Sequence, residues 1–284
     1  MKSYWKNQLP LEGIQDISPV SGGDVNEAFK ITTNDDIYFL LVQRNRKPSF
    51  YAAEMAGLEA FEKADITAPR VIENGEINGD AYLLLSYLEE GSKGSQKELG
   101  QLVAKMHSHQ QSEGKFGFEL PYEGADVSFD NTWSESWSEI FVERRMDHLR
   151  DELLRKNLWN EEDNKVYEQV RSVMINELEN HNSKPSLLHG DLWGGNYMFL
   201  KDGRPALFDP APLYGDREFD LGITTVFGGF TQEFYNEYEK HYPLGKGAEK
   251  RLEFYRLYLF MVHLVKFGGM YASSVNRSMD QILA

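Results

Sequence analysis

The pattern of apolar residues changes once along this chain, near residue 90, and this change restricts the fold more than any other sequence feature. Before it, short segments rich in β-branched and aromatic residues alternate with turn signals and surround one helical segment. After it, long segments carry apolar residues at helical spacing, and only residues 186–209 return to strands. The sequence therefore predicts an α+β protein. Its first part is a small antiparallel sheet with one helix, and its second part is larger and mostly helical.

The expected elements follow one another without long connections. The first part is predicted to hold strands at 14–20, 28–33, 37–43, 69–77 and 81–88, and a helix at 49–66. The second part is predicted to hold helices at 96–109, 133–154, 161–179 and from 216 onward, with strands at 186–189 and 196–209. We expect a first lobe over residues 1–88, a second lobe over 89–284, and a ligand between them.

Charge and composition exclude several classes of protein. The chain has 30 Lys and Arg against 45 Asp and Glu, a formal net charge of −15. Nucleic acids and anionic membranes bind clustered cations, so neither is an expected partner. The chain has no Cys, which excludes disulfides, thiolate zinc sites and a cysteine nucleophile. It shows neither a signal peptide nor an apolar run of about 18 residues, and we expect a cytoplasmic monomer.

The stretch SLLHGDLWGGNYMFL, residues 186–200, contains the residues that point to chemistry. Asn196 follows Asp191 by five residues, and Asp209 ends the next strand segment, which matches the catalytic loop of kinases. Phosphoryl transfer from ATP needs a proton acceptor and a divalent metal. Asp191 is therefore expected to accept the hydroxyl proton, and Asn196 and Asp209 to bind Mg²⁺. A lone HGD is more often a polar turn, but the order of these parts favours a kinase.

Two features indicate that the acceptor is a small molecule. Gly190 stands where protein kinases usually carry the Arg that holds a phosphorylated activation loop. The segment after Asp209, residues 210–222, is too short for an activation loop that docks a protein substrate. The sequence therefore predicts a small-molecule kinase that is active without phosphorylation. His189 is expected to form a hydrogen bond within the loop rather than to bind metal.

The first lobe offers residues that could contact ATP. The turn SGGDVN holds Gly22, Gly23 and Asn26, whose backbone amides could cradle phosphates, although a plain hairpin turn explains it equally well. Glu54 lies in the expected helix, where kinases place the Glu that pairs with a strand Lys; a solvated helical Glu is the alternative. The segment between the lobes is the expected hinge against adenine, with Tyr87, Leu88 and Glu89.

The sequence resembles the fructosamine kinases, also called ketosamine kinases, over nearly its whole length. The most specific matching segments are LLHGDLWGGN and FDPAPLYGDREFDLG. HGDxxxxN alone is shared with aminoglycoside phosphotransferases and choline kinases. The resemblance implies a bilobal protein-kinase-like fold and an ATP- and Mg²⁺-dependent enzyme. Its implied reaction is phosphorylation of a hydroxyl of small or protein-bound ketosamines, in deglycation repair or sugar-amine metabolism. It further implies four substrate-binding or loop-bracing residues: Trp193, Asp216, Arg217 and Glu218.

Two positions depart from the family pattern. The third strand of the family usually carries a Lys that contacts the ATP phosphates, and here Leu41 stands at that point. Lys30, Arg44 or Arg46 could supply the charge from elsewhere, or the pairing with the helical Glu is lost. Asp24 stands where many relatives carry Cys, so any redox switch in that turn is absent.

Two alternatives to a ketosamine kinase stay open at this point. One is another small-molecule kinase whose acceptor is an aminoglycoside or a choline-type amino alcohol. The other is a nucleotide-binding scaffold with weak catalysis, which Leu41 suggests and the presence of Asp191, Asn196 and Asp209 opposes.

Overall fold

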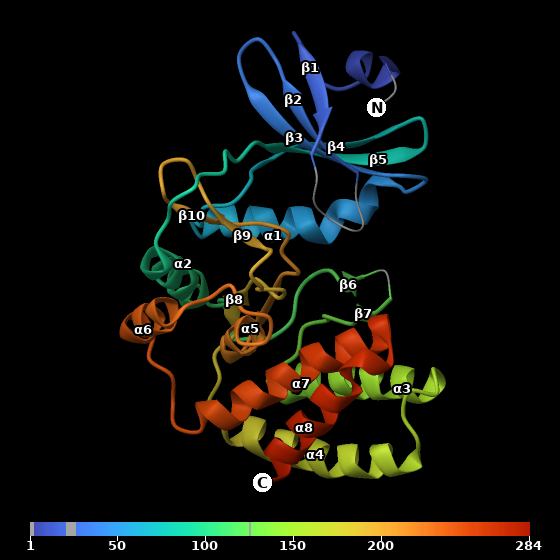
Figure 1. The fold of residues 1–284 in the computed structure, drawn as a ribbon, viewed down its shortest axis with the longest axis vertical. Coiled ribbons are helices and arrows are strands. Elements are labelled where there is room, and N and C mark those ends of the chain that lie inside the picture. Colours follow the sequence, from blue (N-terminus) through green and yellow to red (C-terminus); the bar gives the residue numbers. More distant parts are fainter. Residues whose placement is uncertain (1–2, 21–26, 125) are drawn as a thin grey trace. The chain divides into compact units, whose positions relative to one another are not determined.

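The structure is a computed structural model that describes residues 3–20, 27–124 and 126–284 (Figure 1). The chain forms two compact units. Unit 1 comprises Met1–Ser95 and Met198–Asp209, and unit 2 comprises Gln96–Tyr197 and Pro210–Ala284. Unit 1 thus extends past residue 88 and includes a late segment that the sequence assigns to the second lobe.

Unit 1 is built on a five-stranded antiparallel sheet with the order β1-β2-β3-β5-β4. Its strands are β1 (Asp16–Pro19), β2 (Glu27–Thr32), β3 (Ile37–Gln43), β4 (Val71–Ile77) and β5 (Asp80–Ser86), and each lies within one of the predicted segments or within a residue of it. Asn78 and Gly79 have φ angles of 53° and 85°. Positive φ at two central residues is the backbone of a tight hairpin, and it joins β4 to β5.

The two faces of this sheet are buried in different ways. On one face, apolar side chains from β2, β3 and β5 form a core cluster with the 3-10 helix Ser3–Asn7, which contributes Trp5. Leu40 and Val42 of β3 belong to this cluster. Because successive strand residues point to opposite faces, Leu41 points away from it, and it is only 5% exposed. The helix α1 (Ala52–Lys63), which buries Leu58 and Phe61, belongs to the same unit (Figure 1).

A later hairpin completes unit 1. β9 (Tyr197–Phe199) and β10 (Pro205–Leu207) pair around the turn at Asp202 and Gly203, as the sequence predicts. The Lys201 N–H donates a hydrogen bond to the Glu89 carbonyl at 2.9 Å, and the Leu207 N–H donates one to the Thr67 carbonyl at 2.9 Å. The hairpin is thereby attached both to the segment after β5 and to the segment after α1.

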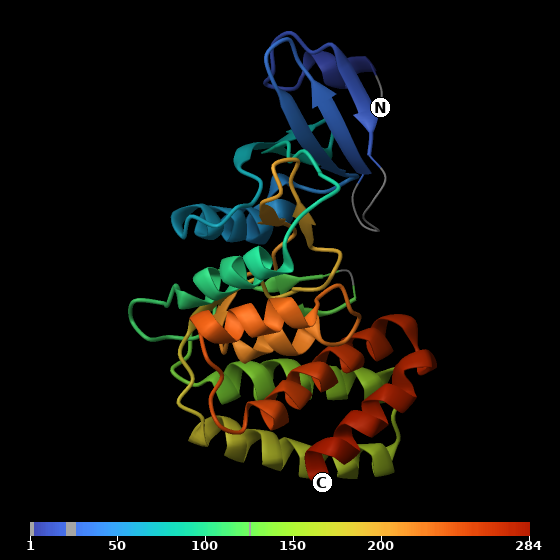
Figure 2. The ribbon, with the colours of Figure 1, turned by 60° about the vertical axis from the view of Figure 1, so that its left-hand side comes forward.

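Unit 2 is mostly helical. After α2 (Gln96–Ser108) and a π-helical segment (Glu139–Met146), the helices are α3 (Asp147–Arg155), α4 (Glu161–Asn180), α5 (Glu218–Thr224), α6 (Gln232–His241), α7 (Ala248–Phe267) and α8 (Ala272–Leu283). In Figure 2 the red helices α7 and α8 lie against the green α3 and the yellow-green α4. None of the helices in the described part of the chain has the length and apolar character needed to cross a membrane.

Two short strand pairs stand among these helices. β6 (Tyr122–Glu123) pairs with β7 (Ser128–Phe129), and β8 (Ser186–Leu188) pairs with β11 (Leu213–Gly215). The sequence predicts β8 but not its partner β11. The loop that contains Asp191 therefore follows β8, and the strand that pairs with β8 is β11, which comes after Asp209 in the sequence.

Shortening Leu40 tests how much the core cluster of unit 1 contributes to stability. Leu40 is fully buried, whereas Ile37 of the same strand is 40% exposed. Leu40→Ala should lower the free energy of unfolding by about 2–5 kcal/mol because it leaves a cavity. The matched variant Ile37→Ala should change it by about 0.5 kcal/mol or less. Urea denaturation of both variants measures the difference, and equal losses would contradict the assignment of the two faces.

Candidate active site

The loop after β8 is folded by hydrogen bonds between its own residues. The Trp193 N–H donates to the Asp191 carbonyl at 3.1 Å, and the Asn196 N–H donates to the Trp193 carbonyl at 3.0 Å. The side-chain Nδ2 of Asn196 donates to the Asp191 carbonyl at 2.8 Å and to its Oδ2 at 3.2 Å. The Asp191 N–H donates to Nδ1 of the buried His189 at 3.3 Å. The structure thus brings Asp191 and Asn196 together. The His189 ring accepts a hydrogen bond within the loop, as the sequence predicts.

Two glycines make this loop possible. Gly190 has a φ angle of 80°, and a Cβ atom there would lie 1.8 Å from the Ala211 carbonyl oxygen. No side chain, and no Arg in particular, fits at this position. A Cβ atom at Gly195 would lie 2.2 Å from the indole ring of Trp193. Trp193 therefore lies across Gly195, and 43% of its surface remains exposed.

The carboxylate of Asp220, on α5, binds the backbone at the start of the Asp191 loop. Its Oδ2 accepts a hydrogen bond from the His189 N–H at 2.7 Å, and its Oδ1 accepts one from the Gly190 N–H at 2.9 Å. Nε2 of the buried His107 lies 3.1 Å from the same Oδ2, and its Nδ1 lies 2.9 Å from the Tyr238 hydroxyl. Asp220 is fully buried and is absent from the predicted site residues, although it ends the motif YGDREFD that the sequence singles out.

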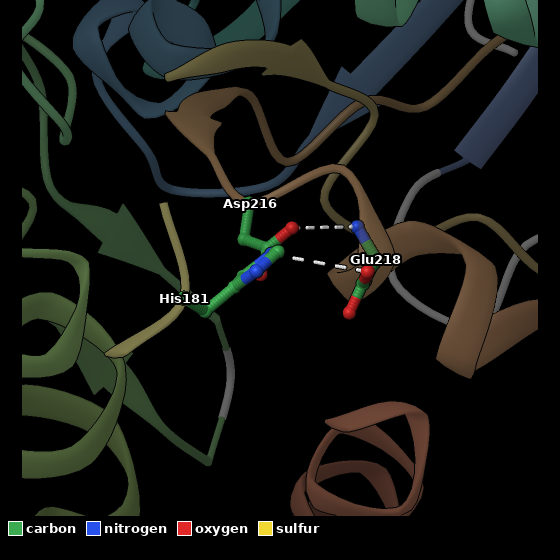
Figure 3. Close-up of side chains that lie close together, drawn as sticks. All are labelled: His181, Asp216 and Glu218. Carbon is green, nitrogen blue, oxygen red and sulfur yellow. Dashed lines mark hydrogen bonds and ion pairs between the residues drawn. The ribbon is translucent and has the colours of Figure 1, made fainter. Parts of the chain in front are cut away.

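Asp216 and Glu218 belong to a buried network with His181 (Figure 3). Nε2 of His181 lies 3.4 Å from Asp216 Oδ2 and 3.8 Å from Glu218 Oε1. Asp216 accepts hydrogen bonds from the Tyr255 hydroxyl at 2.8 Å and from the Glu218 N–H at 3.0 Å. Burial opposes ionisation of Asp216, but the hydrogen bond and the charge of His181 lower its pKa overall. Burial raises the pKa of Glu218.

This network is already satisfied without a metal ion. One ligand atom each of His181, Asp216 and Glu218 lies within 4.8 Å of the others, a spacing that could hold a metal. However, Nε and Nη2 of Arg251 bind the two oxygens of Glu218 at 2.7 and 2.8 Å. A metal ion would have to displace this buried guanidinium, which is the cation that the carboxylate already has. The network therefore joins α5 to α7 and to the segment after α4.

Arg217 contacts Tyr238 of α6 and Tyr242 of the segment after it. Its Nη1 donates hydrogen bonds to the Tyr242 carbonyl at 2.6 Å and to the Tyr238 hydroxyl at 3.0 Å. Its guanidinium lies 3.7 Å from the centre of the Tyr242 ring, a cation–π arrangement. Arg217 thus fixes the segment that follows α6.

In unit 1, burial raises the pKa of two carboxyl groups, those of Glu54 and Asp209. Asp209 has a φ angle of 52°, a left-handed backbone that is often kept at functional sites. Desolvation raises the pKa of its carboxyl group. Burial, and then the negative charge of Asp209, raise the pKa of Glu54 to about 8. Oε1 of Glu54 is buried and has no hydrogen-bond partner among the described residues.

The cations that could replace a Lys at Leu41 are engaged elsewhere. Nζ of Lys30 lies 4.9 Å from the centre of the Tyr87 ring. Arg44 binds Glu27 and Asp80, each at 2.6 Å, and Arg46 lies over the Phe50 ring at 5.7 Å. Within the described part of the chain, no ion pair joins Glu54 to a cation.

The remaining residues expected to contact ATP are only partly described. Tyr87, Leu88 and Glu89 follow β5, and the Glu89 carboxylate pairs with Lys201 Nζ at 2.9 Å. The turn residues of the predicted phosphate cradle, Gly22, Gly23 and Asn26, lie outside the described residues. Asp24 of the same turn also lies outside them.

A family profile and individual related sequences both assign the chain to the same family. The profile of the family described as "Fructosamine kinase" matches residues 2–284. A protein of Staphylococcus aureus (strain NCTC 8325 / PS 47) named "Probable ketoamine kinase" is 70% identical over 283 residues, which cover 100% of this chain and 98% of that protein. "Protein-ribulosamine 3-kinase, chloroplastic" of Arabidopsis thaliana is 34% identical, over 95% of this chain and 83% of that protein.

Solved structures agree on the fold. A crystal structure named "Putative fructosamine-3-kinase" from Haemophilus somnus 129PT is similar to this chain with a TM-score of 0.83 and 27% identity, over 95% of this chain and 92% of that one. The aminoglycoside phosphotransferase APH(4)-Ia is similar with a TM-score of 0.66 and 15% identity, over 95% and 94% of the two chains. The protein-kinase-like α+β fold that the sequence predicts is confirmed, and the chain belongs to the fructosamine kinase family.

Proposed function

We propose that this protein transfers the γ-phosphoryl group of ATP to a hydroxyl group of a ketosamine, an adduct of a sugar and an amine. The observation that carries this proposal is the contact between Asp191 and Asn196 in a loop that Asp220 holds by two backbone hydrogen bonds. Membership of the fructosamine kinase family and the names of the ketoamine and ribulosamine kinases among its relatives support the acceptor class.

In the proposed reaction, the acceptor hydroxyl oxygen attacks the γ-phosphorus of ATP. The bond from that phosphorus to the β–γ bridging oxygen breaks, and ADP leaves with the bridging oxygen. The hydroxyl proton passes to the Asp191 carboxylate. Asn196 donates a hydrogen bond from Nδ2 to Oδ2 of this carboxylate, and this bond favours one rotamer of the proposed base.

The oxygens available to a metal suit Mg²⁺. Because Asn196 uses its Nδ2 toward Asp191, its amide oxygen is the atom it can offer to a metal, and Asp209 offers a carboxylate. Such oxygen donors are the ligands that Mg²⁺ prefers. When bound, Mg²⁺ would neutralise the phosphate charge that develops during transfer.

Two aromatic residues are proposed to contact the acceptor sugar. Trp193 is exposed at the tip of the loop, two residues after the base. Burial raises the pKa of Tyr122 to about 12, and the charge of Asp191 adds a smaller contribution. Its ring stacks on Phe129 at 5.8 Å. We assign Asp216, Arg217 and Glu218 to bracing, because their partners lie within unit 2.

For the donor, the hinge residues Tyr87, Leu88 and Glu89 are proposed to line adenine. The turn with Gly22, Gly23 and Asn26 is proposed to cover the phosphates, on the strength of the family resemblance. The charge of −15 supports a protein without nucleic acid or membrane partners. We further propose that it acts as a cytoplasmic monomer.

Release of ADP in the presence of a set of acceptors tests the proposed function. Purified protein with Mg²⁺ and ATP should turn over fructoselysine or ribuloselysine and leave choline and kanamycin unreacted. Turnover of kanamycin or choline alone would assign the same chemistry to a different acceptor. ATP binding without ADP release from any acceptor would support a scaffold instead.

Asp191→Asn should abolish most of the turnover because the amide cannot accept the proton. We expect kcat to fall by about 10²–10⁴ or more, while the affinity for ATP stays within about twofold of wild type, since Asp191 is not proposed to bind the nucleotide. Steady-state kinetics and calorimetric ATP titration measure the two effects. Asp202→Asn, in the exposed turn of the β9–β10 hairpin, is the control. A variant that kept its rate would rule out Asp191 as the base.

Asp220→Asn tests the bracing of the loop. An amide has one acceptor oxygen, so one of the N–H groups of His189 and Gly190 would lose its buried partner. We expect stability to fall by about 1–3 kcal/mol and kcat to fall while KM for ATP is unchanged. Asp280→Asn, exposed on α8, serves as the control. A loss of stability with unchanged kcat would mean that the brace serves folding alone.

A further inference from the structure

The helices α7 and α8, both red in Figure 2, have a cavity between them that the proposed reaction does not use. Its volume of about 290 Å³ is near the lower end of the range for sites that bind small organic molecules. The lining residues recur at spacings of three and four along each helix, so each set shares one helix face. α7 contributes Glu253, Arg256 and Phe260, and α8 contributes Ser274, Arg277, Ser278 and Gln281.

The one carboxylate in this lining, that of Glu253, already has its partners. Its Oε2 accepts a hydrogen bond from Nη1 of Arg256 at 2.8 Å, and its Oε1 accepts one from the Ser278 hydroxyl at 2.6 Å. Glu253 is buried, and both of its oxygens are used. The negative charge of Glu253 is therefore balanced by one of the two arginines that line the cavity.

Arg256 is held in place and keeps donors that a ligand could use. Its Nε donates a hydrogen bond to the Thr225 hydroxyl at 2.7 Å, at the end of α5. A guanidinium group carries five N–H donors, and Nη2 of Arg256 has no acceptor among the residues that the structure describes. Because Nε and Nη1 fix the planar group, Nη2 is also fixed in its orientation.

Arg277 supplies the charge that the cavity has in surplus. It is exposed on α8, and in the described part of the chain no ion pair joins it to a carboxylate. An unpaired surface Arg is ordinary by itself, but this one lines the same cavity as Arg256. Two guanidinium groups against one carboxylate leave this cavity positive, in a chain whose net charge is −15. The cavity is therefore suited to an anion.

We propose that the cavity between α7 and α8 binds the carboxylate of a small organic acid with an apolar body. The planar fork of a guanidinium group matches the two oxygens of a carboxylate. A single surplus charge suits a carboxylate better than a phosphate ester, which carries nearly two negative charges at neutral pH. Phe260 offers an apolar wall, and Ser274 and Gln281 offer polar groups. This inference does not depend on the proposed function.

Binding of benzoate tests the site without any turnover. Ligand-observed nuclear magnetic resonance should detect binding of benzoate to the wild-type protein and none of benzamide, which has the same shape without the charge. Arg277→Gln should weaken benzoate binding about tenfold or more, because a hydrogen bond between charged groups is lost. Arg155→Gln, exposed on α3, is the matched control and should bind benzoate as wild type does. Equal benzoate affinity of Arg277→Gln and wild type, or equal binding of benzamide, would overturn the proposal.

A second variant tests the location of the site without changing its charge. Gln281 is exposed on α8 and lines the cavity, so the indole of Gln281→Trp should fill it and exclude benzoate. Benzoate that bound this variant as tightly as wild type would lie outside the cavity. Inorganic phosphate should compete weakly with benzoate at the wild-type site. Phosphate that displaced benzoate at equal concentration would contradict the assignment to a carboxylate.

The carboxylate could come from the amino acid that carries the sugar of the acceptor, or from an unrelated small acid. Fructoselysine and its carboxamide, used as alternative acceptors, separate these sources. If the acceptor supplies it, Arg277→Gln should raise KM for fructoselysine about tenfold and leave KM for the carboxamide unchanged. If an unrelated acid supplies it, neither KM should change, whereas benzoate affinity should still fall. A protein that turned over no ketosamine but bound benzoate through Arg277 would refute the proposed function and leave this site standing.

Discussion

The geometry of the active-site loop depends on one carboxylate, that of Asp220. It accepts hydrogen bonds from two consecutive backbone N–H groups, those of His189 and Gly190. These groups lie at the point where the chain leaves β8, and they could not be paired in a strand because Gly190 has left-handed φ. The buried His107 supports the same carboxylate from α2. The position of the proposed base Asp191 is therefore set by a helix thirty residues later in the chain, through an interaction that favours one backbone conformation of the loop.

The sequence predicts much of this structure because the relevant signals are local. The five strands of unit 1 carry β-branched and aromatic residues bounded by turns, and Asp191 and Asn196 meet because they stand five positions apart on one tight loop. The partner of β8 is missed because β11 has three residues, too few to show a period. His181 and Arg251 are missed for another reason: they meet Asp216 and Glu218 only through the packing of distant helices.

Glu54 differs from the buried carboxylates of unit 2 in its hydrogen bonds. In unit 2, Asp216, Glu218 and Asp220 each have hydrogen-bond donors, from Tyr255, Arg251 and the loop backbone. In unit 1, Oε1 of Glu54 has none among the described residues. A satisfied network holds a scaffold in place, whereas an unsatisfied carboxylate costs stability until something binds it. This contrast separates the carboxylates that hold the fold of unit 2 from one in unit 1 whose Oε1 the described residues leave without a hydrogen bond.

The crowding at Gly190 has a consequence for how this enzyme could evolve. A Cβ atom there would overlap the carbonyl oxygen of Ala211. Ala211 is itself held in position, because its N–H donates a hydrogen bond to the His189 carbonyl. Replacement of Gly190 by Arg is therefore prevented by a clash with the main chain, which cannot move aside as a flexible side chain could. Control of the loop by phosphorylation, as in protein kinases, would first require the segment around Ala211 to be rebuilt. The main chain around Gly190 and Ala211 thus excludes one route to control by phosphorylation, the one that places an Arg directly before Asp191.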